Sequence, residues 1–239
     1  VPEDMKLSDA QRNQISAHIS DTAFINNGKI AEELEKLAYP LYFIDYETFP
    51  SAIPMFDGFS PYQQIQFQYE LFVLEKSGGK STRFEFLHAE NSDPSRLFAE
   101  SMQKHIGNTG NIIVWSKKFE CSRNKELAER IPDFKEFFDS VNNRTYDLMD
   151  IFTKQHYVHK DFRGSVSIKK VQPVLAPELS YKELAIQEGG TAASSWIKLI
   201  GDGLSASEKL QLKKDMLEYC KLDAFAMVRI LEELNKVIK

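Results

Sequence analysis

Residues 41–48 read LYFIDYET, and this stretch decides the fold. Its first four residues are apolar and predict a buried strand, which runs directly into Asp45. Side chains alternate between the two faces of a strand, so Asp45 and Glu47 lie on the same face. Two carboxylates at the end of an apolar strand are costly to bury unless a cation lies beside them. Mg²⁺ and Mn²⁺ prefer oxygen ligands and suit such a pair, although a D-x-E pattern alone also fits a solvated strand end.

The pattern outward from this strand predicts an α/β fold with a mixed sheet of about five strands flanked by helices. Residues 65–73 alternate between apolar and polar side chains, and a Gly-Gly turn within 77–80 joins them to a strand at 83–88 as a hairpin. A further strand is expected at 111–115. Residues 146–151 fit either a last strand or the start of a helix. This order of elements is that of the RNase H-like fold.

Helices are expected around the sheet at 94–106, 118–130, 132–140, 180–187 and 191–200, with a long helix from Ser205 to the end. Residues 155–179 are expected to form a polar loop. Two short helices, at 7–19 with Ser8 or Asp9 as its cap and at 29–38, predict an N-terminal helical appendage over residues 1–39. The main domain is therefore expected to cover residues 40–239.

Apolar residues recur on the last helix at spacings of three, four and seven, which predicts a stripe that faces the core. Its members are Leu210, Leu217, Cys220, Ala224, Met227, Leu231 and Leu234. Tyr219 and Asp223 are four residues apart and lie on one face of the helix. The helical angle places Asp223 at the edge of the stripe and Tyr219 further out. That position fits either a cleft or a hydrogen-bonded pair on the helix surface.

The composition indicates a folded chain, because hydrophobic residues make up 42% of the 239 residues. No apolar run approaches the ~18–20 residues that span a bilayer, and the first residues do not resemble a signal peptide, so a cytoplasmic protein without a membrane partner is expected. Cys121 and Cys220 are far apart, which favours a reducing compartment and no zinc site. The net charge of −5 does not by itself indicate nucleic-acid binding, but a carboxylate-rich metal site would contribute to it.

Three segments together resemble the DnaQ-like 3′→5′ exonucleases that carry a tyrosine in their third motif. FIDYET, which contains Asp45 and Glu47, resembles the first motif, and YCKLD, from Tyr219 to Asp223, resembles the third. VWSKKFE occupies the place of the second motif, with Glu120 where Asp is usual. The segments GSVSIKKVQP, LSYKELAIQEGGTAASSW and LEYCKLDAFAMV are also similar to a bacterial domain family of undefined function, found C-terminal in predicted RecB-type nucleases. The resemblance covers about residues 40–239.

This resemblance implies an RNase H-like fold and a two-metal hydrolase that cleaves phosphodiester bonds at a 3′ end of DNA or RNA. Asp45 would bridge two Mg²⁺ or Mn²⁺ ions, and Glu47 and Asp223 would complete the first site. Glu120 would support the second ion, directly or through water. The hydroxyl of Tyr219 would orient the attacking water. Other nuclease domains of the same full-length protein are the expected protein partners.

Several choices stay open in the sequence. Asp147 and Asp150, in YDLMDI, are rival candidates for the fourth acid. Lysines that either contact phosphates or are simply solvated are Lys117, Lys118, Lys169 and Lys170. Aromatic residues that either stack on terminal bases or pack in the core are Phe49, Phe56, Phe59 and Tyr62. The Glu in the second motif and the low net charge favour an alternative function, a weakly cleaving module that binds nucleic acid or a partner. The missing basic balance would also suit a metal-dependent phosphatase or nucleotidase on small substrates.

Overall fold

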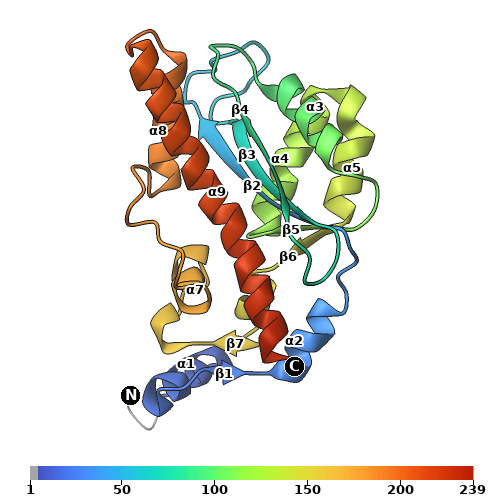
Figure 1. Ribbon diagram of the computed structural model, residues 1–239, viewed down its shortest axis with the longest axis vertical. Coiled ribbons are helices and arrows are strands. Elements are labelled where there is room, and N and C mark those ends of the chain that lie inside the picture. The colour runs from blue at the N-terminus through green and yellow to red at the C-terminus, as the bar shows by residue number, and fades with distance from the viewer. Residues whose placement is uncertain (1–4, 239) are drawn as a thin grey trace.

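The computed structural model describes residues 5–238 and contains one main mixed sheet in that range (Figure 1). Its five strands, in spatial order, are β4 (Thr82–Leu87), β3 (Gln64–Leu74), β2 (Leu41–Pro50), β5 (Asn111–Val114) and β6 (Thr145–Asp147). β2 is antiparallel to β3, and β3 to β4, whereas β5 is parallel to both β2 and β6. The predicted RNase H-like α/β fold is confirmed. The strand that carries Asp45 and Glu47 lies in the middle of the sheet.

Helices cover both faces of the sheet, because β2 is apolar on both sides. One face packs against α3 (Ser95–His105), α4 (Lys117–Arg130) and α5 (Lys135–Asn143), and Tyr42 and Ile44 of β2 belong to that layer. Phe43 points the opposite way, into the core beneath α7 (Ile168–Leu175) and α9 (Ala206–Val237), and α8 (Gly189–Ile200) packs on α9. Figure 1 shows α9 crossing the sheet diagonally. Asp45 and Glu47 share the face of Phe43 and therefore point toward α9.

The last helix begins where the sequence predicts. Ser205 caps α9, and the Ser205 and Glu208 side chains each bond the other's backbone N–H, which forms a capping box. Five members of the predicted stripe are buried, namely Cys220, Ala224, Met227, Leu231 and Leu234. Leu210 is 71% exposed, contrary to the prediction, because it lies at the surface beside Arg83 of the edge strand β4.

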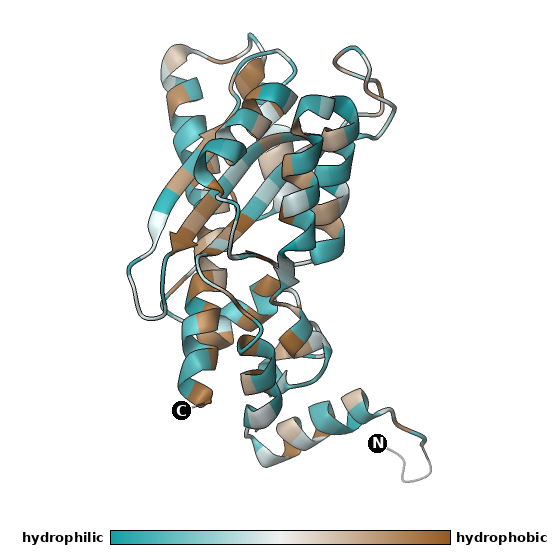
Figure 2. Ribbon diagram, turned by 90° about the vertical axis from the view of Figure 1, so that its right-hand side faces the viewer, coloured by the Kyte–Doolittle hydropathy of each residue, from teal (hydrophilic) through white to brown (hydrophobic). Residues whose placement is uncertain are grey.

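The N-terminal segment contains two helices, as expected. α1 (Asp9–Ser20) begins after Ser8, which forms a capping box with Gln11, and α2 (Asn27–Leu34) lies against α9. Between them β1 (Phe24–Ile25) pairs antiparallel with β7 (Tyr157–Val158), so the segment is joined by backbone hydrogen bonds to a part of the chain more than 130 residues later. Figure 2 shows α1 projecting at the lower end of the molecule, next to the N-terminus.

The segment from 132 to 188 differs from the prediction in two places. Residues 155–179 are not only a loop: they contain β7, the 3-10 helix η2 (Lys160–Phe162) and α7, which continues through Pro173. Packing of Val171 and Leu175 into the core offsets the unfavourable effect of proline. Residues 180–187, expected as a helix, are irregular, because the Gln187 side chain bonds the carbonyls of Lys182 and Leu184 that a helix would use.

The remaining elements agree with the expectations. The 3-10 helix η1 (Pro132–Phe134) precedes α5 in the range predicted as one helix. Residues 146–151, where two interpretations were open, contain both, because β6 ends at Asp147 and α6 (Asp150–Thr153) follows. Within residues 5–238, no helix is long and apolar enough to cross a membrane.

Candidate functional site

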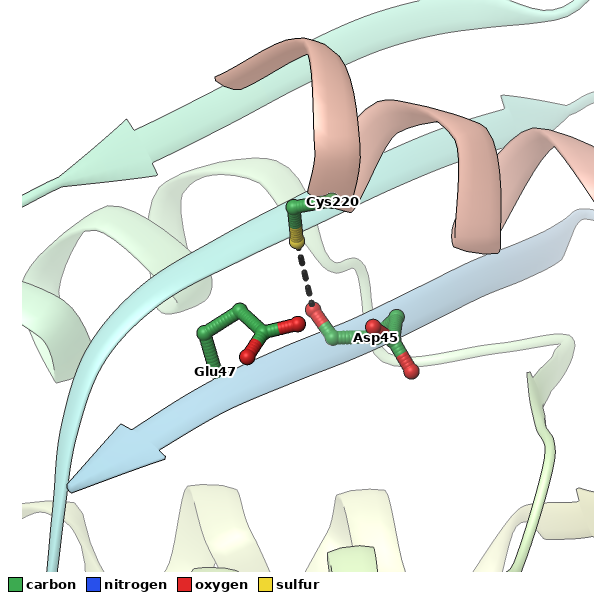
Figure 3. Close-up of side chains that lie close together, drawn as sticks. All are labelled: Asp45, Glu47 and Cys220. Carbon is green, nitrogen blue, oxygen red and sulfur yellow. Dashed lines mark hydrogen bonds between the residues drawn. The ribbon is translucent and has the colours of Figure 1, made fainter. Parts of the chain in front are cut away.

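Asp45 and Glu47 point from the centre of the sheet toward the middle of α9. The Cys220 thiol contacts the backbone carbonyl of Asp45, with a distance of 3.7 Å between sulfur and oxygen. Carboxylate oxygens of Asp45 and Glu47 and the sulfur of Cys220 lie within 4.8 Å of one another (Figure 3). The regular register of β2 against β3 shifts just after Glu47, and such irregularities are common beside active sites.

Asp223 and Tyr219 bring a second part of the site from α9. Both side chains are buried, Asp223 with 6% and Tyr219 with 3% of their surface exposed. The expected position at the edge of the stripe, with Tyr219 further out, is therefore wrong. The pattern of a single helix cannot reveal that α7 and residues 177–188 cover this side of α9. Tyr181, from that covering segment, donates a hydrogen bond from its hydroxyl to the Asp223 carboxylate.

Glu120 joins the site from the first turn of α4. It is 3% exposed, and its Oε2 has no hydrogen-bond partner among the described residues. A buried carboxylate oxygen without a partner is costly, so it points to a ligand that is absent from the protein itself. Burial, followed by the negative charges of Asp45 and Glu47, raises the pKa of Glu120 well above its ordinary value. We call Asp45, Glu47, Glu120 and Asp223 the carboxylate cluster.

Burial disfavours the charged forms of all four members of the cluster, and repulsion by neighbouring acids adds to this effect for Asp45, Glu47 and Glu120. Burial and then the charge of Asp223 raise the pKa of Asp45 well above its ordinary value. Burial and then the charge of Asp45 do the same to the pKa of Glu47. Burial also raises the pKa of Asp223, although the Tyr181 hydroxyl and the Lys169 charge oppose it. Four such groups form a site that a bound cation would stabilise.

The rival acids Asp147 and Asp150 lie outside the cluster. Asp147 accepts hydrogen bonds from the backbone N–H groups of Ser116, Lys117 and Met149. Ser116 has a left-handed backbone with a φ of 87°, so Asp147 stabilises the strained turn from which α4 begins. Asp150 pairs with Lys154 at the surface, with 2.9 Å between the charged atoms. Of the three candidates for the fourth acid, the structure brings Glu120 to Asp45 and Glu47.

The four candidate lysines lie in different surroundings. Lys169 lies at the edge of the cluster: its ammonium donates to the Gln187 carbonyl at 2.6 Å and to the Tyr219 hydroxyl at 3.4 Å. Its positive charge lowers the pKa values of Asp45, Glu47 and Asp223, against the larger effect of burial. The Lys117 ammonium instead bonds the carbonyl of Thr145, and Lys118 and Lys170 are exposed.

Two residues of the site have no signal in the hydrophobic pattern. Tyr181 lies in a segment that the pattern predicts as a helix, so its contact with Asp223 could not be inferred. Gly189 begins α8, and a Cβ there would lie 3.8 Å from Oε2 of Glu47 and 3.9 Å from the Tyr219 hydroxyl. These distances are ordinary van der Waals contacts, so α8 starts directly beside the site.

The aromatic candidates of residues 49–62 divide between core and surface. Phe59 is buried, and the Arg130 guanidinium lies over its ring at 3.8 Å from the centroid. Phe49 and Phe56 pack against the same core layer, whereas Tyr62 is 69% exposed. For Phe59 the packing interpretation is therefore correct.

The donor atoms of the cluster suit a hard divalent cation. They are carboxylate oxygens, which Mg²⁺ and Mn²⁺ prefer, and the unpartnered oxygen of Glu120 is one of them. The Cys220 sulfur lies beside these carboxylates but differs from them in chemical type. Burial and the nearby carboxylates raise the pKa of its thiol well above the ordinary value, so it remains a neutral and poor ligand.

The fold and the cluster define an RNase H-like domain with buried acidic residues converging from β2, α4 and α9. The chain belongs to the family described as "Domain of unknown function (DUF2779)", whose model matches residues 42–167. The bacterial family of undefined function expected from the sequence is thus found, and its description names no activity.

Three curated relatives are similar to nearly the whole chain. The uncharacterized protein MG366 of Mycoplasma genitalium is 26% identical over 94% of this chain and 36% of its own length. The uncharacterized protein UU173 of Ureaplasma parvum is 29% identical over 85% of this chain and 32% of its own. The MG366 homolog of Mycoplasma pneumoniae is 25% identical over 82% of this chain and 32% of its own length. The chain thus spans about a third of the length of these relatives. No solved structure matches it significantly.

Proposed function

We propose that the domain is a metal-dependent 3′→5′ exonuclease-type hydrolase that cleaves phosphodiester bonds of DNA or RNA. One observation carries the proposal: acids from three separate elements lie within electrostatic reach of one another, with Glu47, Glu120 and Asp223 buried, and no Lys or Arg in residues 5–238 forms an ion pair with any of the four. Burying three carboxylates beside a fourth without a cation is costly, so such a cluster is typical of a ligand-binding site. The resemblance to DnaQ-like exonucleases names the ligand as two Mg²⁺ or Mn²⁺ ions.

The roles of the residues follow from their positions. Asp45, Glu47 and Asp223 would hold the ions, with Glu120 supporting the second, and two such ions supply an activated hydroxide and stabilise the leaving oxygen. Tyr219 would orient the attacking water with its hydroxyl, which lies near Gly189, as Oε2 of Glu47 does. Burial and the neighbouring carboxylates raise the pKa of Tyr219, so this hydroxyl keeps its proton and acts as a hydrogen-bond donor rather than as a base.

Two other functions use the same cluster differently. A module that binds nucleic acid or a partner without cutting would fit the Glu at position 120. A phosphatase or nucleotidase on small substrates would fit the net charge of −5. The relatives are about three times as long as this chain, and we propose that their remaining parts supply further nuclease domains.

The test is degradation of single-stranded DNA and RNA labelled at either end, in Mn²⁺ or Mg²⁺. We expect shortening from the 3′ end that EDTA stops and that Asp45→Asn reduces more than about 100-fold, because even indirect partners of metal ligands affect activity by 10–100-fold. The matched control is Asp139→Asn, a partly exposed acid of α5 that pairs with Lys135. Binding without cleavage would favour the module, and release of phosphate only from mononucleotides would favour the phosphatase.

A further inference from the structure

The main sheet ends at β4, and the outer edge of this strand is open. β4 lies at one end of the strand order and pairs with β3. His88, directly after β4, donates its N–H to the carbonyl of Phe67, so the backbone groups of the even-numbered residues of β4 point toward β3. Those of Arg83, Glu85 and Leu87 therefore point outward. Within residues 5–238 no backbone group forms a hydrogen bond with them.

An open edge of this kind can accept a further strand. Edges that stay single are often interrupted by proline, by lysine or by a bulge. The sequence TRFEFL of β4 contains neither of these residues, and its register against β3 is continuous. The strand carries one charge of each sign, Arg83 and Glu85, on the face of the sheet that lies toward α9. The edge is thus suited to pairing, and its two charges restrict which strand can pair with it.

The two charges make this edge complementary to itself. When two β4 strands pair antiparallel about a twofold axis at Phe84, Arg83 of each copy lies opposite Glu85 of the other. Both residues have outward backbone groups, so each such pair exchanges both of its backbone hydrogen bonds. An axis at Arg83 or at Glu85 instead places two arginines or two glutamates opposite each other, which is destabilising. The register centred on Phe84 is therefore favoured over its neighbours.

The side of the edge that faces α9 supplies further positive charge. A groove of about 310 Å³ between β4 and α9 is lined by Lys213 and Lys214 beside Arg83. The acid that α9 contributes to this groove, Glu218, pairs with Lys221. Residues opposite each other in a sheet point to the same face, so the incoming acid of a second copy would share the face of these two lysines.

We propose that β4 is a dimerisation edge, at which two copies of this chain join their main sheets into one continuous sheet in the register centred on Phe84. In the single chain the Arg83 guanidinium pairs with both Glu70 and Glu85, and its side chain is still 34% exposed. The guanidinium has five N–H donors, so it can face a further carboxylate from the second copy. The edge does not involve the carboxylate cluster, and the dimer is therefore independent of the proposed hydrolysis.

The test is the mass of the purified protein in solution, measured by sedimentation and light scattering from about 1 to 100 µM, a range in which small interfaces dissociate. We expect a dimer that dissociates on dilution, because each copy contributes little more than one strand. Glu85→Lys turns two opposite-charge pairs into two like-charge pairs and should weaken the dimer by about tenfold or more. The matched control, Glu136→Lys, makes the same charge change at an exposed position of α5, which leads into β6 at the opposite end of the sheet, and should leave the dimer unchanged.

A second variant changes the backbone of the edge. Glu85→Pro removes an outward N–H group at an edge position, where proline is tolerated, and should abolish the dimer while circular dichroism shows a folded chain. Hydrogen exchange needs no variant. The amides of Arg83 and Glu85 should exchange more slowly as the protein concentration rises, whereas the amide of Phe84, which points toward β3, should be protected at every concentration.

Two outcomes would overturn the proposal. One is a protein that stays monomeric throughout this range of concentration, which would leave the edge to an extended segment of another protein. The other is a dimer whose affinity changes neither in Glu85→Lys nor in Glu85→Pro.

Discussion

Two acidic sites lie side by side on one face of the sheet, and the protein pairs their charges differently. Glu70 of β3 is the direct partner of Asp45 of β2, so both side chains point toward α9. Glu70 is fully buried and receives two hydrogen bonds from the Arg83 guanidinium, at 2.6 and 3.1 Å. Asp45 belongs to a group of four acids for which the described chain offers no such ion pair, only the more distant Lys169.

The difference separates an acid whose charge the protein itself pairs from acids whose charges no Lys or Arg of the described chain pairs. Arg83 completes the pair with Glu70 inside the protein, and the geometry is that of a fork on a carboxylate. The described chain supplies no such partner for the cluster, which is the condition expected of a functional site rather than of a structural one. Removing charge should therefore have opposite effects on stability at the two places.

The largest effect is expected from Arg83→Met. This change leaves Glu70 buried without its partner, and breaking a buried ion pair costs about 3–5 kcal/mol. Urea denaturation at pH 8 measures the loss. The double variant Arg83→Met with Glu70→Gln should recover part of the stability, because it removes the unpaired charge. A single variant as stable as the parent would show that Glu70 does not depend on Arg83.

The next effect is a dependence of stability on pH. Burial raises the pKa of Glu70 to about 7, although Arg83 opposes the shift. The folded state therefore binds this proton more tightly than the unfolded state, in which the pKa is near 4.5. The stability from this group is present below pH 4.5 and is lost as the pH rises to about 7, by on the order of 2–3 kcal/mol.

Denaturation curves between pH 4 and 8 measure this dependence. Glu70→Gln should remove that part of the pH dependence, whereas the exposed Glu75→Gln should keep it. An identical pH profile in parent and Glu70→Gln protein would contradict the assignment.

A smaller loss of about 2 kcal/mol is expected from Asp147→Ala. Three backbone N–H groups lose their acceptor, and the left-handed turn at Ser116 loses its support. Asp150→Ala removes only a surface ion pair and should change stability by less than about 0.5 kcal/mol. Calorimetry in EDTA measures both. Equal losses of stability in the two variants would mean that Asp147 stabilises the fold no more than Asp150 does.

The smallest effect, and the one of opposite sign, is expected from Glu120→Gln. In EDTA this variant should be more stable than the parent by about 1 kcal/mol, because it removes one buried charge from a repelling group. Mn²⁺ should stabilise the parent more than the variant, since a ligand that binds the folded state raises its stability. A Glu120→Gln protein that is less stable than the parent in EDTA would contradict the repulsion between Glu120 and the acids Asp45 and Glu47.

Much of the fold follows from local patterns in the sequence. The alternation of 65–73, the turn at 77–80 and the apolar run before Asp45 each depend on neighbouring residues, and each is found where it was predicted. The same is true of Asp45 and Glu47, whose common face follows from strand geometry alone. The α7 helix was missed, because Pro173 is unfavourable locally and only packing against distant residues compensates for it.

The candidate site was harder to predict from the sequence than the fold was. The burial of Tyr219 and Asp223 depends on a covering segment that lies about 40 residues earlier, and the period of one helix contains no information about it. The contact from Tyr181 was hidden for the same reason. The choice between Glu120 and Asp147 depended on which acid had backbone partners, and such partners become visible only in three dimensions.

The cluster draws Asp45 from an early strand and Asp223 from the last helix, positions separated by 223 − 45 = 178 residues. During synthesis from the N-terminus, the first acids leave the ribosome long before the helix that carries Asp223. The order of synthesis therefore delays the complete cluster until α9 has docked on β2, a contact of high sequence separation that is slow to form. Assembly of the cluster is thus a late folding event, and a nascent chain that lacks α9 contains its first three acids without their fourth.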